Sequence, residues 1–409
     1  MTLKIKYEYL LFLIALIWAL FFSYVIQLKP GFSLTGDDQS YLTAAKELYL
    51  ELKLNDGRPL FISSIIGFPL LFHLPDELVI KWGIFINFSC WFFTILLIFK
   101  IISERLDRKK AFLFSIFFIL CIGNLAIAFN LLSESLFNFM LVLAVFFINK
   151  YFESEKHHFI TIGIAVLLLA ILVKPMAIGL VFILLIFHYR KLKVIVWKSY
   201  IIYCLLSLSL LFFQMYALKK NYGDFTISYI DSITYYNYLG GKADCLKKNI
   251  EYIPGKNERA KYFSKFSSHE QRKIAKNDMK EQLINNKLNL FKSYLFCIYS
   301  NSSKGSYIVS ECKNANQTLY FDFFYFLFKA ISKVQNIFFT IIGVLASIYC
   351  LVKGKNHSTL NSILSIMILY VFFISAISCF QCDRFHIIFF PLVILLLSKY
   401  LETNKVKLF

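Results

Sequence analysis

Long apolar runs alternate with short polar segments along most of the 409-residue chain. A helix needs about 20 predominantly apolar residues to cross the ~30 Å hydrocarbon layer of a membrane. On this basis we predict an all-α polytopic membrane protein with about ten transmembrane helices. They are expected at about 10–28, 80–102, 111–130, 134–149, 159–173, 176–189, 199–218, 334–352, 359–380 and 386–401.

Two longer regions interrupt this pattern. The first, 29–79, contains YLTAAKELYLEL, whose apolar residues recur at helical spacing and predict an amphipathic helix. The stretch RPLFISSIIGFPLLFHLP follows, and its prolines favour a juxtamembrane or re-entrant segment. The second, 219–333, is polar and is expected to form an external loop domain with helices near 257–291. This domain separates an N-terminal transmembrane module (1–218) from a C-terminal one (334–409).

The composition agrees with a membrane protein, because 58% of the residues are hydrophobic and only 17% are charged. Soluble domains carry about 25% charged residues. The net charge of +19 could reflect nucleic-acid binding, or it could reflect basic residues in the cytoplasmic loops of a membrane protein. Lys and Arg collect in the expected inner segments, as cytoplasmic loops do, near 100–110, 150–156, 190–198, 353–355 and 399–407. We therefore expect cytoplasmic N- and C-termini and no nucleic-acid partner.

The cysteines give no strong signal. Cys245, Cys297 and Cys312 fall in the external loop domain, where an oxidising compartment would allow a disulfide, and their pairing is left open. The CFQC sequence at Cys379–Cys382 is an isolated C-x-x-C without the βαβ pattern of thioredoxin-like proteins. No cysteine spacing in the sequence strongly matches a zinc site.

Ionisable residues are rare within the predicted spans but recur at span ends on the outer side. A charge inside a bilayer costs about 2.5–3.5 kcal/mol on insertion scales, so an ion path would leave a series of acids within the spans. The sequence has no such series. The candidate site residues are therefore the outer ones, namely Asp37, Asp38, Arg58, Glu134, Lys174, Arg384 and His386.

Most of these residues also have a structural interpretation. Asp38 lies where a carboxylate could cap the following helix, and Lys174 could extend to the membrane surface from a tight hairpin. Arg384 could be an interface anchor, and His386 could be a buried structural residue. Glu134 stands between apolar neighbours in a short turn, so we expect it to have a partner.

Acids and bases on one face of several hairpins suit the transfer of a sugar from a polyprenyl phosphate. The leaving group is a phosphate anion, which needs cations and no proton donor. The acceptor hydroxyl needs a general base, and a carboxylate can accept its proton. In this hypothesis the catalytic residues are Asp37 and Asp38, and the phosphate- or substrate-binding residues are Arg58, Glu134, Lys174, Arg384 and His386.

The order of these motifs resembles the GT-C class of membrane glycosyltransferases. The similarity is closest to the branch of lipid A aminoarabinose transferases and dolichyl-phosphate-mannose protein mannosyltransferases. It is carried by GDDQSYLTAA, RPLFISSIIGFPLLF, LLSESLFNFMLVLAVFF, LVKPMAIGLVF and RFHIIFFPLVILL. The resemblance implies that Asp37, with Asp38 second, is the base or part of the acceptor site. It also implies that Lys174 and Arg384 contact the lipid phosphate.

The chain departs from this class at two positions, since many relatives have Asp-Glu for Asp37-Asp38 and an arginine for Lys174. The sugar, the acceptor and any divalent cation are therefore left open. We expect a polyprenyl-phosphate sugar donor, a glycan, lipid or protein acceptor, and an active site facing outward from a bacterial cytoplasmic membrane. A transporter or flippase of lipid-linked sugars and an O-antigen polymerase or ligase are the alternatives. The scarcity of polar residues within spans argues against a transporter.

Overall fold

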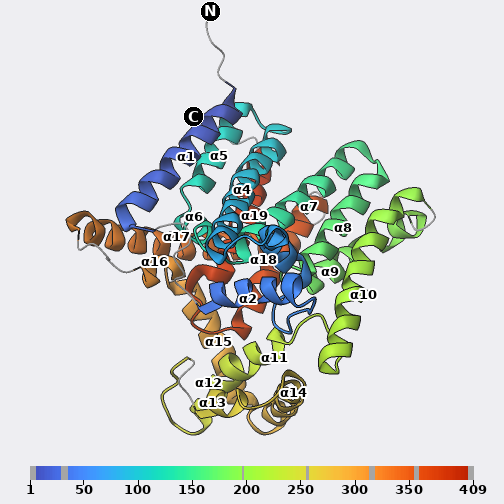
Figure 1. Ribbon diagram of the computed structural model, residues 1–409. Coiled ribbons are helices and arrows are strands. Elements are labelled where there is room, and N and C mark those ends of the chain that lie inside the picture. Colours follow the sequence, from blue (N-terminus) through green and yellow to red (C-terminus); the bar gives the residue numbers. More distant parts are fainter. Residues whose placement is uncertain are drawn as a thin grey trace, which may run out of the picture.

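The computed structural model describes residues 6–28, 36–195, 198–254, 258–312, 318–353 and 359–403. These residues form helices joined by turns, and no β-strand occurs among them (Figure 1). The predicted all-α class is therefore confirmed. The start of the longer region 29–79, namely 29–35, lies outside the described residues.

Among the described residues, six helical segments are long and apolar enough to cross a membrane. They are α1 (Tyr7–Ile26), α4 (Asp76–Ser103), α7 (Glu134–Ser154), η2 (Ser199–Ile201) with α10 (Ile202–Tyr222), α17 (Leu319–Val352), and α18 (Thr359–Ile374) with η5 (Ser375–Ile377). A seventh candidate consists of α5 (Arg108–Ile119) and α6 (Ile122–Ala128), which bend by 63° at the break between them.

The side chain of Gln335 on α17 satisfies the backbone at that break. Its Nε2 donates to the carbonyl oxygen of Leu120 at 2.8 Å, and its Oε1 accepts from the N–H of Ile122 at 3.0 Å. A broken helix at membrane depth needs such partners, because lipid offers no hydrogen bonds.

The ten predicted segments fall on helices, but three of these helices are short. They are α8 (His157–Ile171), the apolar part 177–187 of α9 (Ala177–Ile195), and the part 390–400 of α19 (Phe390–Thr403). Fifteen helical residues extend only about 22 Å, which is less than the ~30 Å hydrocarbon layer. The chain is therefore an integral membrane protein with six or seven candidate spans. A further short apolar pair, α3 (Leu60–Gly67) and η1 (Phe68–Phe72), occupies the proline-broken stretch.

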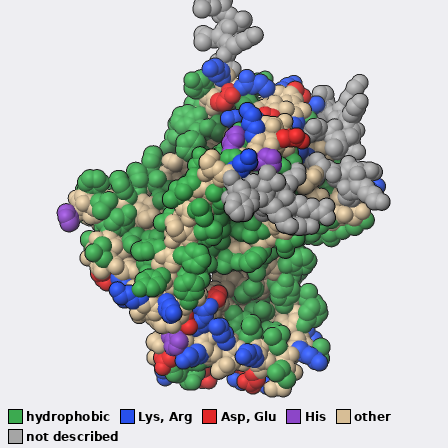
Figure 2. Space-filling model, turned by 90° about the vertical axis from the view of Figure 1, so that its right-hand side faces the viewer, with side chains coloured by type: hydrophobic (Ala, Val, Ile, Leu, Met, Phe, Trp, Pro, Cys, Tyr) green, Lys and Arg blue, Asp and Glu red, His purple; other side chains and the backbone are tan. Residues whose placement is uncertain are grey.

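The long helices turn large apolar side chains outward. Leu20 of α1, Leu206 and Phe213 of α10, and Leu345 of α17 are each more than half exposed. On one face of the molecule, hydrophobic side chains form a broad belt between two charged ends (Figure 2). A belt of this kind suits contact with lipid, because exposing so large an apolar surface to water is unfavourable.

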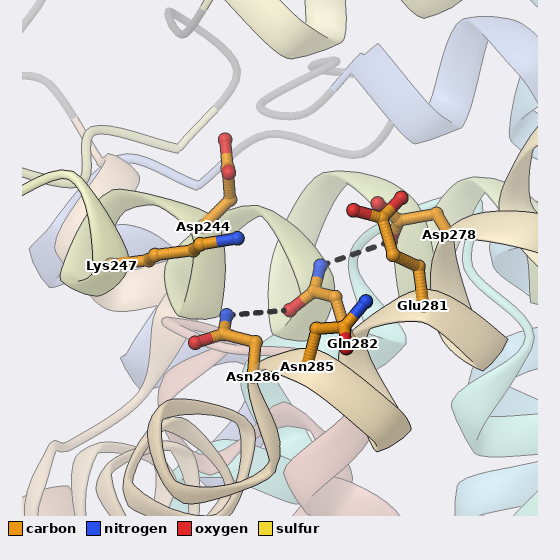
Figure 3. Close-up of a pocket in the computed structure, with 7 residues that line it drawn as sticks. All are labelled: Asp244, Lys247, Asp278, Glu281, Gln282, Asn285 and Asn286. Carbon is orange, nitrogen blue, oxygen red and sulfur yellow. Dashed lines mark hydrogen bonds between the residues drawn. The ribbon is translucent and has the colours of Figure 1, made fainter.

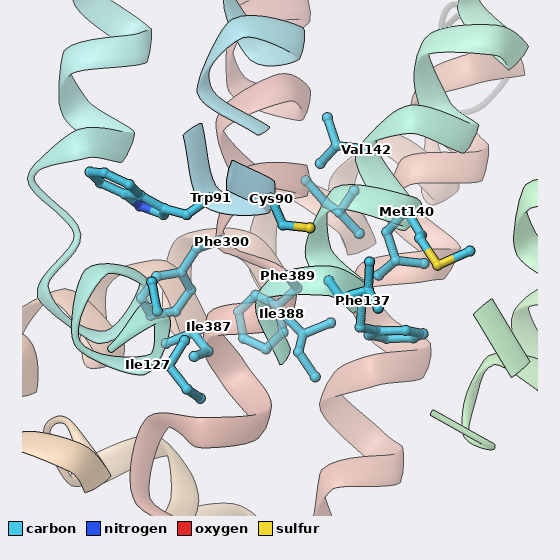
Figure 4. Close-up of a cluster of buried hydrophobic side chains, with 14 of the residues drawn as sticks. Cys90, Trp91, Ile127, Phe137, Met140, Val142, Ile387, Ile388, Phe389 and Phe390 are labelled. Atoms are coloured by element: carbon cyan, nitrogen blue, oxygen red, sulfur yellow. The ribbon is translucent and has the colours of Figure 1, made fainter. Parts of the chain in front are cut away.

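The short helix α19 is buried on all sides instead. Leu392, Val393, Ile394 and Leu395 follow one another in the chain and are all buried. A helix that is apolar all round belongs in a protein core. Figure 4 shows the start of this helix and the end of η6 (Cys382–Ile388) packed against side chains of α4 and α7.

Most of the loop domain lies at the end of the molecule opposite to the start of α1 (Figure 1). Its elements are α11 (Ile230–Thr234), η3 (Tyr235–Leu239), α12 (Gly240–Lys247), α13 (Glu258–Phe263), α14 (Ser268–Asn285), α15 (Lys287–Ser303) and α16 (Tyr307–Glu311). Helices α13 and α14 and the start of α15 agree with the expectation near 257–291. The predicted boundary between 333 and 334 falls inside α17, which runs unbroken from Leu319 to Val352.

A disulfide joins Cys297 of α15 to Cys379, 82 residues later in the chain. The sequence had grouped Cys297 with Cys245 and Cys312, but both of these are buried free thiols. Cys297 instead pairs with the first cysteine of the C-x-x-C, next to η5. The cross-link fastens the loop domain to the segment that leads into η6.

Candidate functional site

Five charged side chains from five separate segments meet at the loop-domain end of the apolar helices. They are Asp37 in the first turn of α2 (Gly36–Leu50), Arg58 before α3, Glu134 at the start of α7, Lys174 between α8 and α9, and Arg384 in η6. We call these five residues the charge cluster. All five were selected from the sequence, and the structure brings them into direct contact.

Asp37 connects two arginines. Its Oδ1 accepts from Nη2 of Arg58 at 2.5 Å, and its Oδ2 accepts from Nη1 of Arg384 at 2.6 Å. Burial alone would raise the pKa of the Asp37 carboxyl, but the two guanidinium groups outweigh burial and hold that pKa well below its usual range. Asp37 is therefore a carboxylate at neutral pH, and both of its oxygens are engaged.

Glu134 forms the buried side of the charge cluster. Its Oε1 accepts from Nε of Arg384 and from Nζ of Lys174, each at 2.7 Å. The partner expected for this acid is therefore present, and it consists of two cations. Burial lowers the pKa of Lys174, while the Glu134 carboxylate opposes that shift. Removing either partner would leave an uncompensated charge in a dry site, which is costly.

Arg58 is held against the amphipathic helix α2. Its Nε donates to Oγ of Ser40 at 2.9 Å, and its Nη1 donates to the hydroxyl of Tyr41 at 3.3 Å. The guanidinium also lies 4.3 Å from the centre of the Tyr41 ring, within range of a cation–π contact. Of the four apolar residues whose spacing predicted this helix, Tyr41 and Ala45 are buried and Leu48 is partly buried. The helix ends at Leu50, and the fourth, Leu52, is 89% exposed.

Exposure decreases through the charge cluster from Asp37 inward. The Asp37 side chain is 33% exposed, those of the three cations are 11–13% exposed, and that of Glu134 is 0% exposed. Among the described residues, Nη2 of Arg384 has no hydrogen-bond acceptor, and Nζ of Lys174 has only Glu134. With three cations around two carboxylates, the charge cluster retains donors and positive charge that an anion can use.

Asp38 has a different role from its neighbour. Its Oδ1 accepts from the backbone N–H of Leu131 at 2.9 Å, and the side chain is only 6% exposed. Helix α2 is described from Gly36, so Asp38 lies within the first turn of the helix. Asp38 fastens α2 to the break between α6 and α7.

His386 lies outside the charge cluster, although it follows Arg384 by two residues. It is fully buried, with Nδ1 3.0 Å from Oγ1 of Thr340 and 3.1 Å from Oδ1 of Asn336. Its Nε2 is 3.2 Å from Oγ of Ser375. These neutral partners agree with the structural interpretation of this histidine and give it no contact with the five charged residues.

Buried asparagines hold the broken backbone around the charge cluster, and the sequence reading did not select them. Asn87 donates to the carbonyl oxygens of Asn130 and Leu132, at 2.6 and 3.0 Å, just before Glu134. Asn124 and Asn138 both donate to the carbonyl oxygen of Ile387, at 3.0 and 3.2 Å. An amide inside an apolar run was the available signal, because freed carbonyls in a membrane protein need such donors.

A divalent cation does not fit the charge cluster. Mg²⁺ and Ca²⁺ favour sites built mainly from oxygen ligands. Both oxygens of Asp37 already accept from arginines, and Glu134 is shared by two cations. In the part of the chain that the structure describes, no group of three His, Cys, Asp or Glu side chains could hold a metal ion. The charge cluster therefore offers side chains, and no metal site, for chemistry.

A small polar pocket in the loop domain is separate from the charge cluster (Figure 3). Its acids and amides largely satisfy one another. Gln282 donates to Asp278 at 3.0 Å, and Asn286 donates to Gln282 at 3.3 Å. Asp278 is further paired with Arg259, whose Nη1 lies 2.7 Å from it. We interpret the pocket as the packing seam between α12 and α14.

No family model, curated protein or solved structure matches this chain. A function must therefore be inferred from the geometry of the charge cluster and from the order of the sequence motifs. Buried charges gathered from distant segments are typical of functional sites, although structural ion-pair networks also occur.

Proposed function

We propose that the protein is a glycosyltransferase that moves a sugar from a polyprenyl-phosphate donor to an acceptor hydroxyl. The observation that carries this proposal is the charge cluster, in which the partly exposed carboxylate of Asp37 lies between two arginines. A lipid phosphate at the edge of a membrane would meet cations there, and the acceptor would meet a carboxylate.

In the proposed step, the bond between the anomeric carbon and the phosphate oxygen breaks, and its electron pair stays on the lipid phosphate. The acceptor oxygen forms a bond to the same carbon, and its proton passes to the Asp37 carboxylate. Arg384 and Lys174 have unused donors and would stabilise the charge that develops on the phosphate. Glu134 would hold these two cations in place.

A carboxylate between two arginines is a weak base, so the proposal needs a way to strengthen it. A phosphate that binds Arg384 would compete with Asp37 for the same guanidinium. The pKa of Asp37 should then rise toward its ordinary value, because one of the two groups that lower it is diverted. Binding of the donor would thus prepare the base for the acceptor.

We further propose that the chain crosses the membrane ten times in a GT-C-like arrangement, with α8, α9 and α19 as short crossings. The cytoplasmic location of both termini is inferred from the basic inner segments. The charge cluster would then face the periplasm or exterior of a bacterial cell. The acceptor would be a surface glycan, a lipid-linked saccharide or a protein hydroxyl.

The proposal can be tested with purified protein in lipid nanodiscs and a radiolabelled pool of polyprenyl-phosphate sugars. We expect Asp37→Asn to lower the transfer rate by about 10²–10⁴-fold, the usual contribution of a general base. Lys46→Gln is the matched control, because Lys46 forms an exposed ion pair with Asp76 in the same outer region. The control should transfer sugar at the wild-type rate. Asp38→Asn should lower the stability of the protein, because Asp38 accepts a hydrogen bond from the backbone N–H of Leu131.

Undiminished transfer by Asp37→Asn would remove this residue as the base. Movement of labelled lipid between leaflets without a covalent product would favour the transporter or flippase. Activity with oligosaccharide diphosphate donors alone would favour a polymerase or ligase. A comparison of cell-surface glycan masses with and without the gene would identify the missing sugar and its acceptor.

A further inference from the structure

The turn that precedes Arg384 has a strained backbone. Phe380 and Cys382 have φ angles of 61° and 53°, in the left-handed region that residues other than glycine rarely adopt. Each such residue costs on the order of 1–3 kcal/mol and persists only where the surroundings hold it. Contacts from outside the turn must therefore fix the segment that presents Arg384.

Asn301 of α15 provides three of these contacts. Its Nδ2 donates to the carbonyl oxygens of Ser375 and Ser378, at 3.0 and 2.8 Å. Its Oδ1 accepts from the backbone N–H of Gln381 at 3.0 Å, and the carbonyl oxygen of Gln381 accepts from the N–H of Arg384 at 3.1 Å. Two successive hydrogen bonds thus connect a fully buried side chain of the loop domain to the backbone of Arg384.

A second amide supports Asn301 from behind. Nδ2 of Asn336 donates to the carbonyl oxygens of Asn301 and Lys304, both at 2.7 Å. Oδ1 of Asn336 lies 3.1 Å from Nδ1 of His386, and Nε2 of the same ring lies 3.2 Å from Oγ of Ser375. The network therefore reaches η6 on both sides of the arginine and returns to the turn before it.

The arginine at the centre of this network has little freedom. Arg384 contacts Asp37 through Nη1 at 2.6 Å and Glu134 through Nε at 2.7 Å. Two charged partners that bind two different nitrogens fix both the position and the rotation of the guanidinium. A displacement of about 1 Å would lengthen at least one of these bonds, and errors of that size are costly at sites that stabilise charge.

We propose that Asn301 is a positioning residue that fixes Arg384 in the charge cluster, with Asn336 and His386 as its supports. The inference rests on the proposed function for the nature of the ligand, a lipid phosphate. It gives the loop domain a part in the site, because α15 holds the turn that orients the phosphate-binding arginine. Without this contact the turn would relax and Arg384 would lose its orientation.

The test compares Asn301→Asp with Asn286→Asp. The first variant keeps the shape and the acceptor for Gln381, but it removes the two donors to the turn. The second removes an equivalent donor elsewhere in the loop domain, since Nδ2 of Asn286 lies 3.2 Å from the carbonyl oxygen of Ala243. Asn301→Ser is a milder variant that retains one donor. Each protein is placed in nanodiscs and examined by hydrogen exchange over 379–388 and by titration with polyprenyl phosphate.

We expect Asn301→Asp to exchange faster over 379–388 and to bind polyprenyl phosphate about 10–100-fold more weakly, as when outer partners of metal ligands are removed. Asn286→Asp should lose thermal stability while keeping wild-type exchange at 379–388 and wild-type affinity. Unchanged exchange over 379–388 in a folded Asn301→Asp protein, or affinity within twofold of wild type, would overturn the inference. Should the aspartate variant not fold, Asn301→Ser decides by the same two measurements.

The two proposals fail separately. Wild-type protein that does not bind polyprenyl phosphate would reject the proposed function. The exchange measurement would still decide whether Asn301 holds the turn, because it does not depend on the ligand.

Discussion

The two ends of α7 each carry a group of ion pairs, and these groups are built differently. At its start, Glu134 belongs to the charge cluster. At its other end, Lys150 meets Glu104 at 2.6 Å and Glu153 at 3.1 Å, and the buried Asn149 accepts from Arg105 at 2.7 Å. We call this second group, Glu104, Arg105, Asn149, Lys150 and Glu153, the inner clamp.

Within the described residues, the inner clamp joins the ends of α4 and α7, and its charged side chains are 17–30% exposed. Partly exposed pairs of this kind contribute about 0–1 kcal/mol and suit a simple link between neighbouring helices. The charge cluster joins residues up to 347 positions apart, and four of its five side chains are 13% exposed or less. Burying so many charges is costly, and helix packing alone does not require it. The charge cluster is therefore a better candidate for a functional site than the inner clamp.

The largest difference between the two groups should appear when one acid is neutralised in each. Glu134→Gln leaves the guanidinium of Arg384 and the ammonium of Lys174 buried without their shared carboxylate. We expect a loss of about 3–5 kcal/mol in the free energy of unfolding, as for other broken buried pairs. Denaturant unfolding in mixed micelles measures this loss.

Glu104→Gln in the inner clamp is the matched control. Its carboxylate is partly exposed and Lys150 retains Glu153, so the expected loss is below about 1 kcal/mol. Equal losses for the two variants would contradict the distinction between the two groups.

The disulfide should matter for the charge cluster and not for the inner clamp. Replacing Cys297 and Cys379 together by alanine removes the covalent link between α15 and the turn before Arg384, while the hydrogen bonds of Asn301 remain. We expect a loss of about 2–4 kcal/mol in the free energy of unfolding and lower affinity for polyprenyl phosphate. Hydrogen exchange should accelerate over 375–388, while the ends of α4 and α7 should exchange at the wild-type rate. A uniform increase along the whole chain would instead indicate a general loss of stability.

Local sequence patterns were sufficient to select the members of the charge cluster but not to predict their contacts. Each of the five stands at the end of an apolar run, where hydropathy and charge can be read directly. Local patterns could not predict that Asp38 accepts a hydrogen bond from the backbone N–H of Leu131, because Leu131 lies 93 residues away in the chain. The pairing of Cys297 with Cys379 has the same origin in long-range packing.

The fold was predictable to a similar extent. Apolar runs located the helices, but they did not show which helices, like α19, are buried on all sides and which, like α1 and α10, expose large apolar side chains. The boundary predicted between 333 and 334 falls inside α17, because Asp322, Lys329 and Lys333 make the first half of this helix resemble a polar loop in the sequence. These side chains project from one continuous amphipathic helix, so a change in composition did not mark a change in structure.

A smaller effect is expected from Asp383, which adjoins the charge cluster but pairs with backbone. Its Oδ1 accepts from the N–H of Tyr307 at 3.1 Å, and burial raises the pKa of Asp383 to about 7 despite its backbone hydrogen bonds. The unfolded chain releases this proton near pH 3.8. Between about pH 4 and 7 the folded state therefore holds a proton that the unfolded state has lost, so stability falls as pH rises. Asp37, with a lowered pKa, adds no such slope in this range.

Asp383→Asn should remove this pH dependence, because the amide keeps the shape and cannot ionise. Between pH 5 and pH 8, the free energy of unfolding of the variant should rise by roughly 1–2 kcal/mol relative to that of wild type. One titrating group can change this free energy by at most about 1.4 kcal/mol per pH unit. Denaturant midpoints of both proteins at the two pH values measure the gain. Parallel pH profiles for the two proteins would show that Asp383 is ionised throughout.

The smallest effect is expected at the basic residue of the inner clamp. Lys150→Gln removes two partly exposed ion pairs, and the free energy of unfolding should change by less than about 1 kcal/mol. Raising the salt concentration should reduce even this difference, because exposed pairs are screened. Binding of polyprenyl phosphate and transfer activity should equal those of wild type, since Lys150 lies at the opposite end of α7 from Glu134. A loss of binding in this variant would mean that the two ends of α7 are coupled, and the charge cluster could then no longer be treated as a site that acts independently of the inner clamp.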